Sequence, residues 1–141
     1  MGAIPINTTG TKKRVFIFED NPNNRAIMQL LLEHMNITVS FERWGSRIVE
    51  RLRAFAPIDL ILMDLMFPNE VSGYDLFDLI RAEADLADIP IIAVSAADAS
   101  QAIPKTRSKG FNGFIAKPIE LDKFPQYIAQ ALDKKPVWIG G

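Results

Sequence analysis

One aspartate, Asp64, ends a run of apolar residues in the stretch LILMDLMFPNEVSG, residues 60 to 73. A carboxylate at the end of a buried run is costly to remove from water unless a partner pairs with it. The side chain could simply cap the turn after its strand through a hydrogen bond to the backbone. It could instead act as a nucleophile or a metal ligand, if other polar groups reach the same place. The rest of the chain has to supply those groups.

Polar side chains also stand at the ends of three other apolar runs. These residues are Glu19 and Asp20, Ser95, and Lys117. Three carboxylates in one place repel each other unless a cation is present, and Lys117 is the candidate side chain. Oxygen ligands favour a hard ion, and Mg²⁺ typically binds one or two carboxylates together with phosphate oxygens. The set predicts Mg²⁺-dependent phosphoryl transfer, with Asp64 as the nucleophile that forms an acyl phosphate.

These polar residues can meet only if the segments between them fold so that the ends of the four apolar runs lie at the same edge of a sheet. Apolar runs and helical periodicity predict strands at 15–19, 37–41, 58–64, 89–96 and within 111–118, and helices at 23–35, 46–55, 73–84 and 121–135. Such alternation predicts an α/β fold with a parallel sheet covered by helices on both faces. Ligands then bind beyond the carboxyl ends of the strands, where the polar residues stand.

The length and composition of the chain restrict the kinds of protein it can be. With 141 residues, 48% of them hydrophobic, the chain fits one compact domain. Sixteen Lys and Arg against 17 Asp and Glu give no basic field for nucleic acid, and the absence of cysteine excludes disulfides and thiolate metal sites. The start has no signal-peptide core, and no segment reaches the roughly 20 apolar residues of a membrane span. We expect a soluble, cytoplasmic protein.

The order and spacing of these motifs resemble a known family from Val15 to about Leu132. The acidic pair Glu19 and Asp20, Asp64 in LILMDLMFP, Ser95 in IIAVSA and Lys117 in FIAKPI resemble the receiver domain of response regulators in two-component signalling, of the single-domain, CheY-like type. The resemblance implies a flavodoxin-like (βα)5 fold. Its doubly wound, five-stranded parallel sheet would have the order 2-1-3-4-5, with helices on both faces.

The resemblance also implies a magnesium site. Asp20 and Asp64 would bind Mg²⁺ directly, Glu19 would hold it mainly through water, and the backbone carbonyl of Met66 would add a ligand. These four residues are the metal ligands that we expect.

The remaining site residues would contact the phosphoryl group or respond to it. By the resemblance, Ser95 and Lys117 would contact the phosphoryl oxygens on Asp64. Phe114 matches the aromatic switch position of the family, whose ring turns inward as the Ser95 hydroxyl is drawn toward the phosphate. Phe in place of Tyr keeps the apolar reason to bury the ring but lacks a hydroxyl.

Two positions depart from the family pattern. The loop after the phosphoacceptor keeps Pro68 at its fourth residue, but its glycine, Gly73, falls at the ninth instead of the eighth. Pro104 lies inside the segment that usually forms the fourth helix, where proline removes a backbone donor. We expect that helix to be short, kinked or to begin near residue 104, and the usual output surface to differ.

The chain divides into a flexible N-terminal arm at 1–13, a receiver domain at 14–135 and an apolar tail at 136–141. The tail, PVWIGG, could fold back on the domain, or contact a second copy or a partner. No DNA-binding region is expected after residue 135. Output would then occur through protein contact or onward phosphotransfer.

The expected function is that of a stand-alone receiver and not of a conventional enzyme. A histidine kinase or histidine phosphotransfer protein would donate the phosphoryl group to Asp64, and the domain would catalyse this transfer and a slow hydrolysis of its own acyl phosphate. A downstream protein would be the target, and a homodimer is possible. The alternatives are a receiver-like module that is not phosphorylated and acts by protein binding, and a phosphohydrolase with an aspartyl nucleophile. Phosphohydrolases generally place a second acid two residues after the nucleophile, where this chain has Met66.

Overall fold

Strands and helices alternate along the whole described part of the chain. The computed structural model describes residues 12–43, 47–68 and 71–140. Within these ranges the strands are β1 (Arg14–Phe18), β2 (Thr38–Glu42), β3 (Leu60–Met63), β4 (Ile91–Ser95), β5 (Gly113–Ala116) and β6 (Val137–Ile139). The helices are α1 (Pro22–His34), α2 (Ile48–Phe55), α3 (Gly73–Arg81), α4 (Ala99–Lys109) and α5 (Phe124–Leu132).

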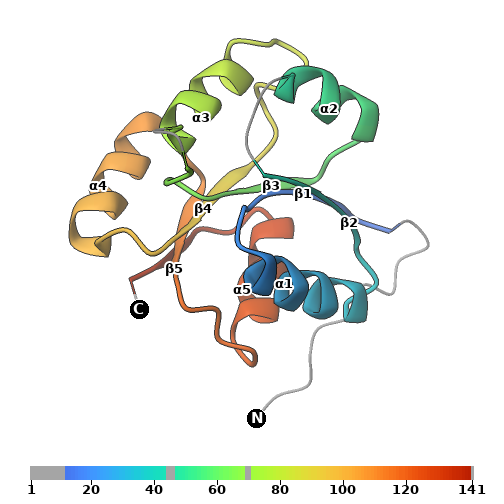
Figure 1. Ribbon diagram of the computed structural model, residues 1–141, viewed down its shortest axis with the longest axis vertical. Coiled ribbons are helices and arrows are strands. Elements are labelled where there is room, and N and C mark those ends of the chain that lie inside the picture. The colour runs from blue at the N-terminus through green and yellow to red at the C-terminus, as the bar shows by residue number, and fades with distance from the viewer. Residues whose placement is uncertain (1–11, 44–46, 69–70, 141) are drawn as a thin grey trace.

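The strands form one parallel sheet with the order β2-β1-β3-β4-β5-β6. Helices α1 and α5 cover one face of the sheet, and α2, α3 and α4 cover the other (Figure 1). The predicted doubly wound α/β fold and the order of the first five strands are therefore confirmed. The prediction of five strands was incomplete, because residues 137–139 of the apolar tail add a sixth strand beside β5.

The core lies in two layers because successive residues of a strand point to opposite faces. Phe16 and Phe18 of β1 pack among the residues under α2, α3 and α4, whereas Val15 and Ile17 pack among those under α1 and α5. Strands β1, β3 and β4 are buried on both faces, which explains why they appear in the sequence as continuous apolar runs. A sheet buried in this way holds the ends of its strands in a fixed arrangement.

The helix boundaries follow local capping signals. Asn21 is the N-cap of α1, where its side chain accepts a hydrogen bond from the Asn24 N–H at 3.0 Å, and Pro22 occupies the first turn. Helix α5 is shorter than the predicted segment at 121–135. Residues 1–11 of the predicted N-terminal arm and residue 46 of the predicted second helix lie outside the described residues. In the ranges that the structure describes, no helix is long and apolar enough to span a bilayer.

Helix α4 differs from the prediction. It begins at Ala99 and runs for 11 residues with Pro104 inside it, so the expectation of a short helix or one beginning near residue 104 is wrong. Proline removes the N–H that would bond to the carbonyl of Ser100, but both residues are exposed, and water can take the place of that donor. The side chain of Asp98 caps the helix by accepting from the Ser100 N–H at 3.0 Å. The capped start of the helix and the exposed position of the missing N–H donor allow the helix to continue through Pro104.

Candidate functional site

The carboxyl ends of β1, β3 and β5 bring the predicted polar residues to one edge of the sheet. Asp64 follows β3, and its N–H donates to the carbonyl of Phe18 in β1 at 3.1 Å. Lys117 follows β5, and its N–H donates to the carbonyl of Ser95 in β4 at 2.9 Å. These backbone bonds continue the ladder of the sheet past the strand ends. The positions of the side chains are therefore set by strand pairing and not by flexible loops.

Glu19, Asp20 and Asp64 form an acidic cluster. One carboxylate oxygen of each residue lies within 4.8 Å of the others. Glu19 is 1% exposed and Asp64 is 6% exposed, whereas Asp20 is partly exposed. Carboxylates held this close in a buried place repel each other and favour a cation among them.

Lys117 supplies one cation to this cluster. Its Nζ lies 2.7 Å from Oε1 of Glu19 and 2.9 Å from Oδ2 of Asp64, and its side chain is 12% exposed. Burial lowers the pKa of Lys117, but its hydrogen bonds and charge interactions with the two carboxylates outweigh burial and raise the pKa above the usual value. Burial raises the pKa of Glu19, although Lys117 and the N–H of Asn21 act in the opposite direction. Lys117 therefore stays protonated and neutralises only part of the acidic charge.

The cluster fits a hard divalent cation such as Mg²⁺. Its donors are all oxygens, and Asp20 keeps the cluster accessible from solvent. Oε1 of Glu19 is buried and lies 2.7 Å from Nζ of Lys117, and by strict geometric criteria it has no hydrogen-bond partner among the described residues. A buried carboxylate oxygen in this condition is suited to contact a metal or its water shell.

The two oxygens of Asp64 have different partners. Oδ1 accepts hydrogen bonds from the N–H groups of Leu65 at 2.7 Å and Met66 at 3.3 Å, and Oδ2 accepts from Lys117 at 2.9 Å. Oδ1 thus caps the turn after β3, as one of the two alternatives predicted from the sequence. Oδ2 instead belongs to the charged cluster with Lys117. The N–H of Met66 faces Asp64 in this way, and its carbonyl as a metal ligand stays a prediction.

Gly73 packs directly against the backbone of Asp64 and Leu65, a role that was not predicted from the sequence. A Cβ at Gly73 would lie 2.1 Å from the carbonyl oxygen of Asp64 and 2.8 Å from Cα of Leu65, and the N–H of Gly73 donates to the carbonyl of Leu65 at 3.0 Å. Met66 and Ser72 form an antiparallel bridge across the lengthened loop, of which residues 69–70 lie outside the described ranges. The sequence signal was a glycine directly after a helix-capping serine, where backbone can approach backbone closely.

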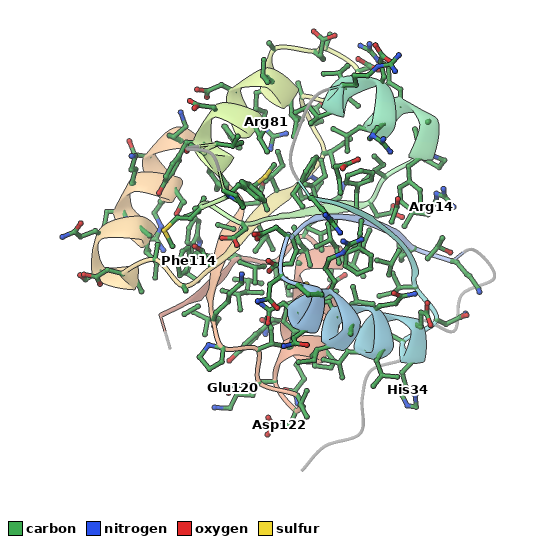
Figure 2. All side chains as sticks on the ribbon, viewed as in Figure 1. Arg14, His34, Arg81, Phe114, Glu120 and Asp122 are labelled. Carbon is green, nitrogen blue, oxygen red and sulfur yellow. The ribbon has the colours of Figure 1, made fainter. Side chains whose placement is uncertain are left out.

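Ser95 is the last residue of β4, and Phe114 lies within β5. The hydroxyl of Ser95 is fully buried and accepts a hydrogen bond from the Ala97 N–H at 3.2 Å. The ring of Phe114 is fully buried in the core layer that includes Ala102 of α4 (Figure 2). The contact of Ser95 with a phosphoryl group and the switch role of Phe114 stay predictions.

With this geometry in place, comparisons with known proteins identify the family. The model of the "Response regulator receiver domain" family matches residues 15–129. The polar-differentiation response regulator DivK of Brucella ovis is 33% identical over 120 residues, which cover 85% of this chain and 96% of DivK. The CAI-1 autoinducer sensor kinase/phosphatase CqsS of Vibrio cholerae is 29% identical over 137 residues, 96% of this chain but only 19% of the length of CqsS.

A solved structure gives the same result. The receiver domain of the sensor histidine kinase PA1611 from Pseudomonas aeruginosa is 27% identical, with a TM-score of 0.70 over 86% of this chain and 98% of that domain. That structure was obtained with a magnesium ion coordinated in its active site cleft. Fold, acidic cluster and sequence similarity agree, and the chain belongs to the family of response regulator receiver domains of two-component signalling.

Proposed function

We propose that this receiver accepts a phosphoryl group on Asp64 from a phosphohistidine, in a reaction that depends on Mg²⁺. The observation that carries the proposal is the position of Asp64, whose carboxylate lies close to Glu19 and Asp20, which follow β1, and contacts the ammonium of Lys117. The donor would be a histidine kinase or a histidine phosphotransfer protein in the cytoplasm. Similarity to DivK, a response regulator, and to CqsS, a sensor kinase/phosphatase, supports this class of partner.

The transfer requires a nucleophile in line with the bond that breaks. A carboxylate oxygen of Asp64 would form a bond to phosphorus while the phosphorus–nitrogen bond of the phosphohistidine breaks. The electron pair stays with the ring nitrogen, and the ring, protonated at its other nitrogen, leaves as neutral imidazole. The product is an aspartyl phosphate, whose slow hydrolysis by water would return the free carboxylate.

The cluster would hold the charge of the phosphoryl group. Lys117 already contacts Oδ2 of Asp64 at 2.9 Å, so its ammonium would also reach an oxygen of a group attached there. Ser95 would donate its hydroxyl proton to another oxygen. Mg²⁺, held by Asp20 and Asp64 directly, by Glu19 mainly through water and by the carbonyl of Met66, would supply positive charge beside the transferred oxygens.

The test is covalent labelling from acetyl phosphate, a small acyl-phosphate donor, followed by intact-mass measurement. We expect the wild-type protein to gain one phosphoryl group with Mg²⁺ and none with a chelator, and Asp64→Asn to gain none. Asp75→Asn is the matched control, because Asp75 is exposed in the first turn of α3 and should leave labelling unchanged. Labelling that survives Asp64→Asn would reject the nucleophile. A wild-type protein that takes no label would favour the protein-binding module that is not phosphorylated.

A further inference from the structure

Strand β6 places an aromatic ring directly beside Phe114. The two strands are parallel, with the register Gly113↔Val137, Phe114↔Trp138 and Ile115↔Ile139. Side chains at matched positions of neighbouring strands lie on the same face. Phe114 is fully buried there, and Trp138 packs against the same core layer. The position next to Phe114, at what would be the open edge of the sheet without β6, is therefore occupied by Trp138.

Two residues, Gly113 of β5 and Arg107 of α4, form the seat on which β6 packs. A Cβ at Gly113 would lie 2.3 Å from the carbonyl oxygen of Val137, so only glycine lets β6 approach this closely. The guanidinium of Arg107 in α4 lies 4.4 Å from the centre of the Trp138 ring, within the range of a cation–π interaction. Trp138 thus connects the sheet edge to α4.

Strand β5 connects this seat to the acidic cluster. Its last residue, Ala116, precedes Lys117, whose Nζ contacts Glu19 and Asp64. Movement of β5 therefore changes the position of the ammonium, and anchoring of the ammonium restricts β5. The three residues of β6 form a short strand at the edge of the sheet, and a short edge element can open locally while the rest of the domain stays folded.

We propose that β6 is a clasp whose docking is coupled to occupancy of the acidic site, with Trp138 as the coupling residue. The coupling rests on the proposed function, because the ligand that would act through it is a phosphoryl group on Asp64. Such a group adds a further partner for Lys117 and orders the end of β5. Docking β6 on an ordered β5 loses less conformational freedom, so occupancy tightens β6. By linkage, loss of β6 weakens occupancy by the same factor.

The experiment measures amide hydrogen exchange of residues 137–139 with and without beryllofluoride, a phosphoryl mimic, in the presence of Mg²⁺. We expect the mimic to slow exchange of those β6 amides that face β5 about fivefold, the lower end of typical coupling factors. Trp138→Ala should remove this protection and weaken the affinity for beryllofluoride by the same factor. Trp138→Phe keeps an aromatic ring over Arg107 and should keep both effects.

Two controls separate coupling from a general loss of stability. The amides of β1 and β3 should exchange equally in wild type and Trp138→Ala. Leu79→Ala, which removes a side chain 53% exposed on α3, should leave the protection of β6 and the beryllofluoride affinity unchanged. The clasp is rejected if the factor by which beryllofluoride slows β6 exchange differs from the factor by which Trp138→Ala weakens beryllofluoride binding. It is also rejected if Leu79→Ala loses the protection and the affinity to the same extent as Trp138→Ala.

Labelling of Asp64 by acetyl phosphate is measured in parallel and decides the proposed function separately. If Asp64 is labelled while exchange of β6 changes by less than twofold, the clasp is rejected and the proposed function stands. If Asp64 takes no label, the proposed function is rejected, and the clasp is judged with beryllofluoride and Mg²⁺ as the ligand. Protection of β6 by beryllofluoride that disappears in Trp138→Ala supports the coupling, and its absence in the wild type rejects it.

Discussion

At the scale of single residues, Glu19 is a group whose burial opposes folding when it is ionised. Its carboxylate is 1% exposed, and burial raises its pKa above the usual value of 4.5 despite the nearby ammonium of Lys117. A carboxyl group with a raised pKa favours the folded state when protonated. That contribution is fully present below the pKa of the unfolded chain and is lost as the pH rises through the pKa of the folded protein. At neutral pH, ionised Glu19 therefore lowers the stability of the metal-free protein.

Replacing Glu19 by an uncharged isostere should reverse this effect. We expect Glu19→Gln to raise the Tm of the Mg²⁺-free protein at pH 7 by about 2–4 °C, the shift that ~1 kcal/mol produces in a chain of roughly this size. The difference should shrink below pH 4.5, because the wild-type carboxyl is then protonated as well. Thermal melts followed by circular dichroism at both pH values measure it. A lower Tm for Glu19→Gln at pH 7 would show that the pair with Lys117 outweighs desolvation.

At the scale of elements, the junction of β3 and α3 determines where Asp64 stands. Helix α3 begins at Gly73, with Ser72 as the N-cap, and its first residue packs on the backbone of Asp64 and Leu65. The bridge between Met66 and Ser72 closes the intervening loop. The contact of the helix with Asp64 is kept although the loop is one residue longer than is usual in the family.

A methyl group at the start of α3 should disturb Asp64. Gly73→Ala places a Cβ within 2.1 Å of the Asp64 carbonyl, so either α3 or Asp64 must shift. We expect a loss of about 1–3 kcal/mol in the free energy of unfolding, as for other overpacked sites. We also expect acetyl phosphate labelling to slow roughly tenfold or more, because small misplacements of a nucleophile are costly.

Gly140→Ala is the matched control for that substitution. Its Cβ would meet Ala99 and Ile103 at 3.7 Å, an ordinary contact, so its stability should stay within about 0.5 kcal/mol of the wild type. Urea unfolding and labelling rates of both variants provide the comparison. Equal behaviour of the two variants would show that the start of α3 yields without moving Asp64.

At the scale of the whole molecule, the acidic site is assembled from distant parts of the chain by a single sheet. Two core layers share the strands of that sheet, so neither layer can be lost without the other. Asp20, Asp64 and Lys117 come together only when β1, β3, β4 and β5 pair in register. A ligand of the site therefore binds the folded state and not the unfolded chain.

Metal binding should stabilise the entire domain by mass action. At a Mg²⁺ concentration of about 100 times the dissociation constant, the gain is roughly 2.7 kcal/mol. We expect a wild-type Tm that rises with Mg²⁺, and little rise in Asp20→Asn, which removes one carboxylate from the cluster. Na₂SO₄ at matched ionic strength, in place of MgSO₄, controls for screening. A rise of equal size in Asp20→Asn would exclude Asp20 as a ligand.

The sequence alone determined much of the fold and the members of the acidic cluster. Apolar runs buried on both faces alternate with amphipathic helices, and this pattern admits a parallel sheet covered on both sides. The carboxyl ends of parallel strands meet at one edge, so polar residues at the ends of the runs 15–19, 58–64 and 111–118 had to come together there. These conclusions depend on periodicity and chain order, which are local properties.

Only the tertiary structure decided how these parts fit. A pattern of apolar residues does not reveal that Lys117 pairs with both Glu19 and Asp64, or that Gly73 leaves room for the carbonyl of Asp64. The sequence also predicted an α4 that is short, kinked or begins near residue 104, because the sequence shows the proline but not its surroundings. In the structure Pro104 is exposed, so its missing N–H donor is tolerated. Strand β6 is the clearest case. Its apolar residues were compatible with docking to the domain or to a partner, and the seat at Gly113 and Arg107, distant in sequence, decided for the domain.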